Sequence, residues 1–105
     1  MTDILNEYSS FVKNTYKYDF GYGDLLYLSN GMGGEVGEVQ NEIKKMYRLF
    51  KDESSLEQAK NLKREEIKKE LGDVLWYLTA ICNKMDISLK DIIVENIEKN
   101  KDKLN

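Results

Sequence analysis

Two segments decide the fold of this chain: GGEVGEVQNEIKK at residues 33–45 and KKELGDVLWYL at residues 68–78. In both segments the apolar residues recur at the period of an amphipathic helix. Each segment also carries two acidic residues spaced three positions apart, Glu35 with Glu38 and Glu70 with Asp73. Because residues i and i+3 share one helix face, the two carboxylates of a pair should lie together along one edge of the apolar stripe.

Helical patterning extends along most of the chain and predicts an all-α protein with four helices, at residues 3–18, 24–51, 55–84 and 88–103. The breaks are expected at three short segments, namely GYG at 21–23, KDESS at 51–55 and MDIS at 85–88. Serine favours the N-cap position because its side-chain oxygen accepts a backbone N–H at the helix start. We therefore expect Ser54 or Ser55 to cap the third helix and Ser88 to cap the fourth.

The glycine-rich segment NGMGG at residues 30–34 opposes a continuous second helix. Each glycine inside a helix costs about 1 kcal/mol relative to alanine. The apolar series from Leu25 to Phe50 nevertheless passes through the segment without a change of phase. We therefore read residues 24–51 as one helix, in which small residues would let another helix or a ligand approach the backbone.

Length and composition limit the class of protein. With 105 residues the chain should form a single domain over residues 1–105, with a core so modest that self-association would help to complete it. A net charge of -3 and a pI of about 5.0 argue against a nucleic-acid binder. No apolar run approaches the roughly 20 residues that a membrane span needs. The lone Cys82 has apolar sequence neighbours, which indicates a reduced thiol in a cytoplasmic protein.

The acidic pairs suggest a metal site. Like charges this close repel one another, so two such pairs favour a cation placed between them. The chain has no histidine, which removes the usual zinc ligand. Carboxylate oxygens suit Mg²⁺ or Mn²⁺ instead.

Antiparallel packing of the second and third helices would bring the two acidic edges together at the rim of a bundle, where facing helices commonly build metal sites. On the second helix, Glu42 falls on the same edge as Glu35 and Glu38 and is a further candidate for the group. The alternative is a plain solvated helix face, which is the usual meaning of an ExxE or ExxD in a chain that is 33% charged.

The sequences of these two segments resemble the metal motif of the MazG-like, all-α nucleoside triphosphate pyrophosphohydrolases. That motif reads EExxE followed by ExxD. The N-terminal NEYSSFVKNTYKY and the C-terminal ISLKDIIVENIEKNKDK, which contains Asn96-x-x-Lys99, resemble the first and last helices of that family. Gly34 replaces the first Glu of the doublet, as in a branch that reads GExGE. The resemblance implies a four-helix bundle that is completed by oligomerisation, as a homodimer or a homotetramer.

It also implies an enzyme that hydrolyses a (d)NTP to the (d)NMP and pyrophosphate, with a house-cleaning role in the nucleotide pool. Carried over by position, Mg²⁺, or Mn²⁺ as a substitute, would be held by Glu35, Glu38, Glu70 and Asp73. Glu38 is the residue expected to orient or deprotonate the attacking water, since no histidine can do so.

The resemblance further suggests cationic and polar residues that bind the substrate phosphates, namely Lys45, Arg48, Asn96 and Lys99. Two alternatives stay open. One is a phosphoribosyl-ATP or dUTP/dCTP-selective pyrophosphohydrolase of the same superfamily. The other is a helical interaction module that keeps the fold without catalysis.

Overall fold

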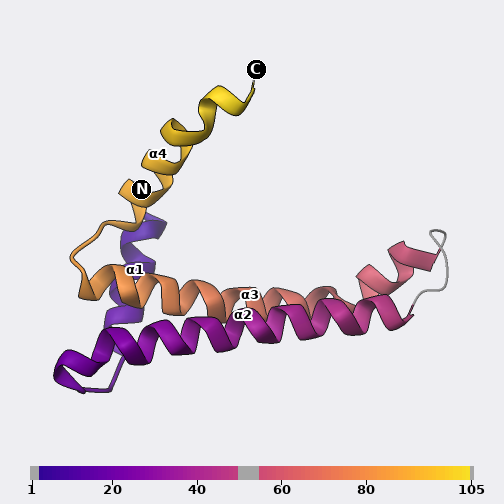
Figure 1. Ribbon diagram of the computed structural model, residues 1–105, viewed down its shortest axis with the longest axis horizontal. Helices are drawn as coiled ribbons and strands as arrows, with labels where there is room; N and C mark the ends of the chain where they lie inside the picture. The colour runs from indigo at the N-terminus through magenta and orange to yellow at the C-terminus, as the bar shows by residue number, and fades with distance from the viewer. Residues whose placement is uncertain (1–2, 50–54, 105) are drawn as a thin grey trace. The chain divides into compact units, whose positions relative to one another are not determined.

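The computed structural model describes residues 3–49 and 55–104, and this part of the chain contains four α-helices and no strand. The helices are α1 (Ile4–Thr15), α2 (Asp24–Leu49), α3 (Leu56–Lys84) and α4 (Leu89–Asn100) (Figure 1). Short 3₁₀ turns occupy Gly21–Gly23 and Lys101–Leu104. The predicted all-α class is therefore confirmed. None of the helices described is both long and apolar enough to cross a membrane.

The chain divides into two compact units, one made of residues 1–28 and 78–105 and the other of residues 29–77. The first unit contains α1, α4 and the adjoining ends of α2 and α3. Its core includes the buried side chains of Val12, Leu28, Cys82 and Leu89. The prediction of a single domain over residues 1–105 stays a prediction.

In the first unit the first helix is shorter than predicted. We expected it to continue to residue 18, but α1 ends at Thr15 and Tyr16 adopts an extended backbone. The Tyr16 hydroxyl donates a hydrogen bond of 2.7 Å to Asp24, and the Phe20 N–H donates one of 2.9 Å to the same carboxylate oxygen. Lys84 pairs with the other oxygen of Asp24 at 3.0 Å. These contacts fix the segment 16–20 in a non-helical path.

The predicted turn before the last helix is confirmed. Asp86 adopts a left-handed backbone conformation with φ of 54°, and the Ile87 N–H donates to the Cys82 carbonyl at 2.9 Å, which closes the end of α3. The Ser88 hydroxyl then accepts the Asp91 N–H at 3.3 Å and caps α4 as expected. Two other predictions involve residues outside the described ranges. They are the end of the apolar series of the second helix at Phe50 and the capping of the third helix by Ser54.

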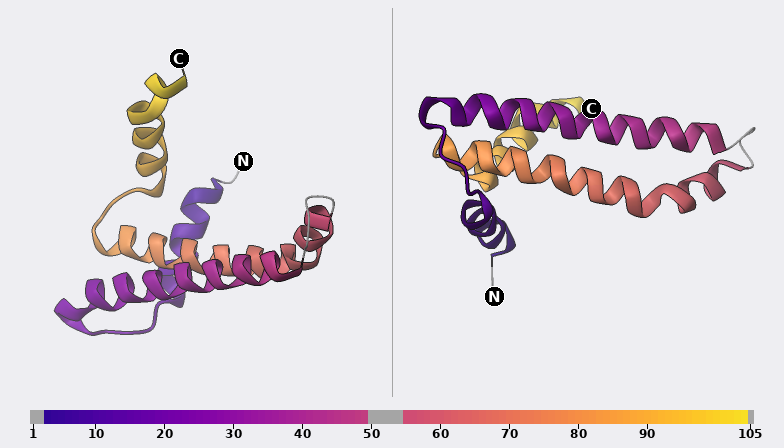
Figure 2. Two further views of the ribbon diagram at one scale, coloured as in Figure 1. Left: turned by 45° about the vertical axis from the view of Figure 1, so that its right-hand side comes forward. Right: turned by 90° about the horizontal axis from the view of Figure 1, so that it is seen from below.

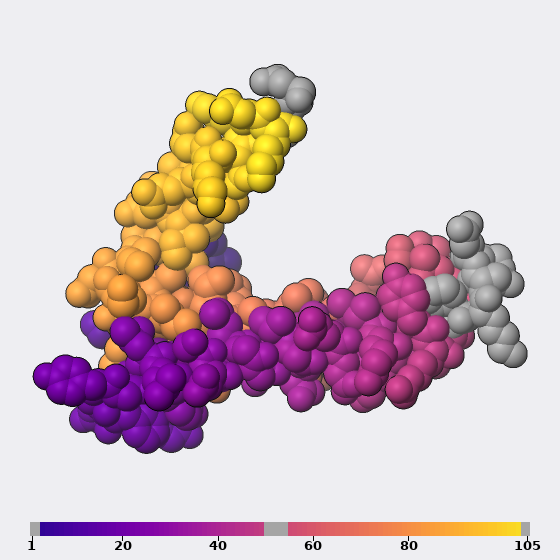
Figure 3. Space-filling view, viewed as in Figure 1, coloured from indigo at the N-terminus to yellow at the C-terminus, as the bar shows by residue number. Residues whose placement is uncertain are grey.

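The second unit is an antiparallel pair of helices formed by the larger parts of α2 and α3. The two helices lie side by side in all three ribbon views (Figures 1 and 2), and side chains of α2 cover much of the face that is turned to the viewer in Figure 3. As predicted, α2 continues through the glycine-rich segment 30–34. A Cβ at Gly31 would overlap the ring of Tyr77, so at this glycine the α3 side chain does approach the α2 backbone.

Candidate metal centre

Three of the four predicted ligands converge between α2 and α3. Glu35, Glu70 and Asp73 each offer a carboxylate oxygen, and these oxygens lie within 4.8 Å of one another. The i, i+3 spacing on α3 brings the last two to one face, and the antiparallel pairing brings Glu35 opposite them. The side chains of Glu35 and Glu70 are half-buried, whereas Asp73 is exposed.

The electrostatics of Glu35 reflect this crowding. Partial burial raises the pKa of the Glu35 carboxyl above its ordinary value of 4.5, and the neighbouring charges of Asp73, Glu70 and Glu38 raise it further. Within the described ranges, no Lys or Arg forms an ion pair with Glu35, Glu70 or Asp73. The part of the chain that the structure describes therefore leaves the negative charge of these carboxylates without a cationic partner.

The donor set fits a hard divalent cation. Three carboxylate oxygens at this separation can surround one ion, and an oxygen-only donor set is typical of Mg²⁺ or Mn²⁺ sites that keep some coordinated water. A bound cation would also remove the repulsion that raises the pKa of Glu35.

Glu38 takes a different position from the other three. Its side chain is exposed and does not belong to the group of converging oxygens, yet it lies close enough for its charge to raise the pKa of Glu35. The predicted four-carboxylate set is thus three converging groups with a fourth beside them. An exposed carboxylate at this position could act on a ligand or on a water molecule next to the cluster.

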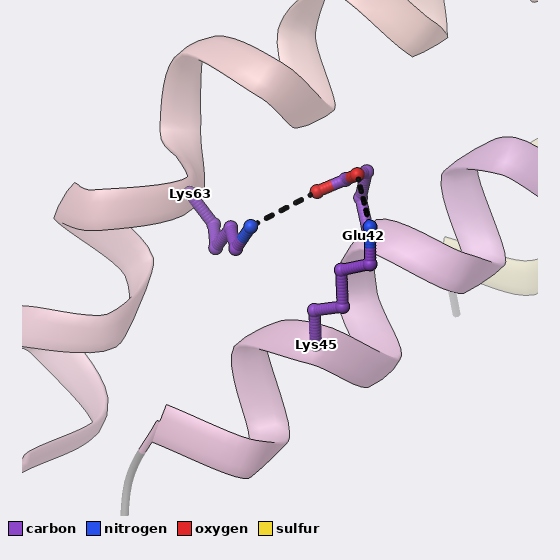
Figure 4. A network of polar contacts seen from close by, with 3 residues as sticks. All are labelled: Glu42, Lys45 and Lys63. Carbon is purple, nitrogen blue, oxygen red and sulfur yellow. Dashed lines mark hydrogen bonds and ion pairs between the residues drawn. The ribbon is translucent and has the colours of Figure 1, made fainter.

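Glu42, the further candidate on this edge, has its own partners. Its two carboxylate oxygens accept from Lys63 at 3.2 Å and from Lys45 at 3.3 Å (Figure 4). These hydrogen bonds, led by that of Lys63, hold the pKa of the Glu42 carboxyl below its ordinary value of 4.5. Glu42 is therefore not one of the converging acids.

The predicted phosphate-binding residues are placed as follows. Lys45 pairs with Glu42, and Arg48 is exposed in the last turn of α2. Asn96 and Lys99 are exposed on α4, in the other unit, where the Asn96 carbonyl accepts from the Asn100 side chain at 2.9 Å. Their roles toward a substrate stay predictions.

Lys63 is a residue that sequence reasoning missed. A signal was present, because Lys63 precedes Glu70 by seven residues and Glu42 follows Glu35 by seven. In an antiparallel pair of helices, that symmetry places Lys63 opposite Glu42 once Glu70 is placed opposite Glu35. The two seven-residue spacings can be read from the sequence, but the register of α2 against α3, which pairs Lys63 with Glu42, comes from the structure.

Comparison with known proteins identifies the family. Residues 24–104 match the family model of the MazG nucleotide pyrophosphohydrolase domain. The Gene 37 protein of Mycobacterium phage L5 is 35% identical to this chain over 75 residues, which cover 71% of this chain and 61% of the phage protein. The chain therefore spans less than two thirds of that relative, and no solved structure matches it. This chain belongs to the MazG nucleotide pyrophosphohydrolase family.

Proposed function

We propose that this protein hydrolyses a nucleoside triphosphate to the nucleoside monophosphate and pyrophosphate, and so clears unwanted nucleotides from the cytoplasmic pool. The observation that carries the proposal is the convergence of Glu35, Glu70 and Asp73, with none of the described lysines or arginines paired to them, in a chain of this family. Mutually repelling acids at a helix interface are unfavourable for folding unless a ligand compensates them. This favours the enzyme over a helical interaction module without catalysis.

Glu35, Glu70 and Asp73 would hold a Mg²⁺ ion, with Mn²⁺ as a substitute. When bound, Mg²⁺ supplies charge that offsets the phosphate oxygens and lowers the pKa of a coordinated water. The converging acids of α2 and α3 would hold the ion beside the substrate. They also bring negative charge that would repel a polyanion if the ion were missing.

Glu38 would act as the general base in this scheme. The chain has no histidine, and Glu38 is the exposed carboxylate next to the converging three. It would accept a proton from the water whose oxygen attacks the α-phosphorus. The bond between the α-phosphorus and the oxygen that bridges to the β-phosphorus then breaks, and pyrophosphate leaves.

The bond that breaks separates this reaction from that of other NTPases. The sequence has no GxxxxGK[ST] motif, so the loop that cradles the β- and γ-phosphates for terminal phosphoryl transfer is missing. We therefore expect NMP and pyrophosphate in equal amounts, without an NDP intermediate.

The experiment is to incubate the purified protein with a panel of NTPs, dNTPs and phosphoribosyl-ATP, with and without Mg²⁺, in ¹⁸O-water. Label in the monophosphate supports the proposal. Label in pyrophosphate, or NDP and orthophosphate as early products, would contradict it. A strong preference for dUTP or dCTP, or activity only on phosphoribosyl-ATP, would identify the corresponding member of the superfamily, and no hydrolysis would support the interaction module.

We also propose that the chain self-associates, as a homodimer or homotetramer. Apolar residues along the two long helices remain exposed, among them Val36 and Ile43 on α2 and Leu71 and Leu75 on α3. Exposed apolar side chains on both long helices of so small a chain favour an interface with a second copy. Light scattering at micromolar concentration should give at least a dimer, and a mass of 12.3 kDa at high concentration would contradict this.

A further inference from the structure

The carboxylate of Glu42 lies between two ammonium groups that come from different helices (Figure 4). Lys63 reaches it across the helix pair from α3, and Lys45 reaches it from one turn along α2. The three side chains together carry one more positive than negative charge. A single lysine would be enough to compensate Glu42, so the second one leaves an excess that can attract an anion.

This group lies in line with the metal centre. Glu42 follows Glu35 on α2 by the same seven residues that separate Lys63 from Glu70 on α3. At 1.5 Å per residue, the two cross-helix pairs are about 10 Å apart along the helix axis, on the same edge of the pair. The edge therefore carries an acidic group at one place and a cationic group two turns away.

We propose that Lys45 and Lys63 form a clamp for the terminal phosphates of the nucleotide and that Glu42 occupies this clamp until a phosphate displaces it. The inference rests on the proposed function, since it assumes that the α-phosphate lies at the converging carboxylates. A lysine ammonium binds phosphate as a compact point charge, and two of them on one site suit a polyanion.

The exposure of the three side chains fits this exchange. The side chains of Lys63 and Glu42 are 22% and 13% exposed, so water screens the attraction between their charges only in part. The side chain of Lys45 is 44% exposed, so an anion can reach it from solvent. Glu42 thus holds both lysines in place while the clamp is empty. In this role it is an internal competitor of the phosphate.

The test is calorimetric titration of inorganic pyrophosphate into the full chain, at low ionic strength, with and without Mg²⁺. We expect Lys63→Gln to weaken pyrophosphate binding by about ten-fold through loss of a charge-assisted contact. Lys63→Arg should keep most of the binding. Glu42→Gln should tighten it, because the competing carboxylate is removed.

The matched control is Lys60→Gln, one turn away on α3. Lys60 pairs at 3.2 Å with Glu57 on its own helix, and both side chains are well exposed. This variant should bind pyrophosphate like the wild type, and melting curves of all variants verify folding.

Three outcomes overturn the clamp: no binding of pyrophosphate by the wild type, equal loss in Lys63→Gln and Lys60→Gln, or weaker binding in Glu42→Gln. Failure of the proposed function is seen separately. If the chain hydrolyses no nucleotide but the variants rank as expected, the cationic pair stands as an anion site. If it hydrolyses nucleotides and Lys63→Gln binds pyrophosphate normally, only the clamp is wrong.

Discussion

Glu35 and Glu42 lie on the same edge of α2, seven residues apart, and both face α3, yet their surroundings are opposite. Glu35 meets Glu70 and Asp73, which helps to raise the pKa of its carboxyl, whereas Glu42 meets Lys63, which helps to lower it. The residue that α3 places across the interface therefore decides what each acid can do. Glu42 is compensated by two lysines, whereas none of the described lysines or arginines pairs with Glu35.

The largest expected effect is on activity. Asp73→Asn removes a converging carboxylate, and Glu38→Gln removes the proposed base, so each should lower turnover by about 100-fold or more. The control is Glu57→Gln, which changes an exposed acid at the start of α3 that pairs only with Lys60 in the described ion pairs. Wild-type turnover of Asp73→Asn at saturating Mg²⁺ would show that this acid belongs to the solvated surface.

The second effect is on stability without metal, and its sign separates Glu35 from Glu42. A raised carboxyl pKa means that ionised Glu35 destabilises the fold at neutral pH, so Glu35→Gln should be more stable than the wild type in EDTA. A lowered pKa means that ionised Glu42 stabilises the fold, so Glu42→Gln should be less stable.

Both differences depend on pH in a predictable way. The gain in Glu35→Gln should shrink as the pH falls through the raised pKa of the wild-type Glu35 toward 4.5. The loss in Glu42→Gln should persist to about pH 4.5 and vanish below it, as the wild-type Glu42 is protonated. Denaturant unfolding at pH 7 and pH 3 measures both, and two variants that shift stability in the same direction at pH 7 would refute the comparison.

The smallest expected effect concerns the close approach of the Tyr77 ring on α3 to the backbone of α2 at Gly31. A methyl group at Gly31 would overlap the Tyr77 ring, while one at Gly33 would meet no atom within 4 Å. Gly33→Ala should therefore raise the free energy of unfolding by about 0.5–1 kcal/mol through helix propensity. The free energy of unfolding of Gly31→Ala should be lower than that of Gly33→Ala by about 1 kcal/mol or more, since the Tyr77 ring must move to make room for the methyl group. Equal stability of the two variants would show that the ring moves freely.

The sequence was sufficient to predict the four helices and the acidic edges, because both depend on local periodicity. The cap at Ser88 and the continuity of α2 through residues 30–34 were also predicted correctly. The end of α1 was not, because it depends on the contact of Tyr16 with Asp24, which is made between separate elements.

In the candidate site, too, the local features could be predicted and the contacts between helices were harder to predict. The i, i+3 spacing was enough to identify Glu70 and Asp73 as neighbours, and their convergence with Glu35 was expected from antiparallel packing. The partner of Glu42 was missed although the equal seven-residue spacings pointed to it, because Lys63 is 21 residues away along the chain and is one of several lysines on α3. Only the helix register selects it.

The contrast between the converging acids and the lysine-paired Glu42 is tested most directly by calorimetric titration of Mg²⁺ into the wild type, Asp73→Asn and Glu42→Gln. We expect a saturable site in the wild type, its loss in Asp73→Asn, and its retention in Glu42→Gln, since the Glu42 carboxylate pairs with Lys45 and Lys63 instead. Equal Mg²⁺ binding by Asp73→Asn and the wild type, or loss of the site in Glu42→Gln alone, would contradict the assignment of the metal centre.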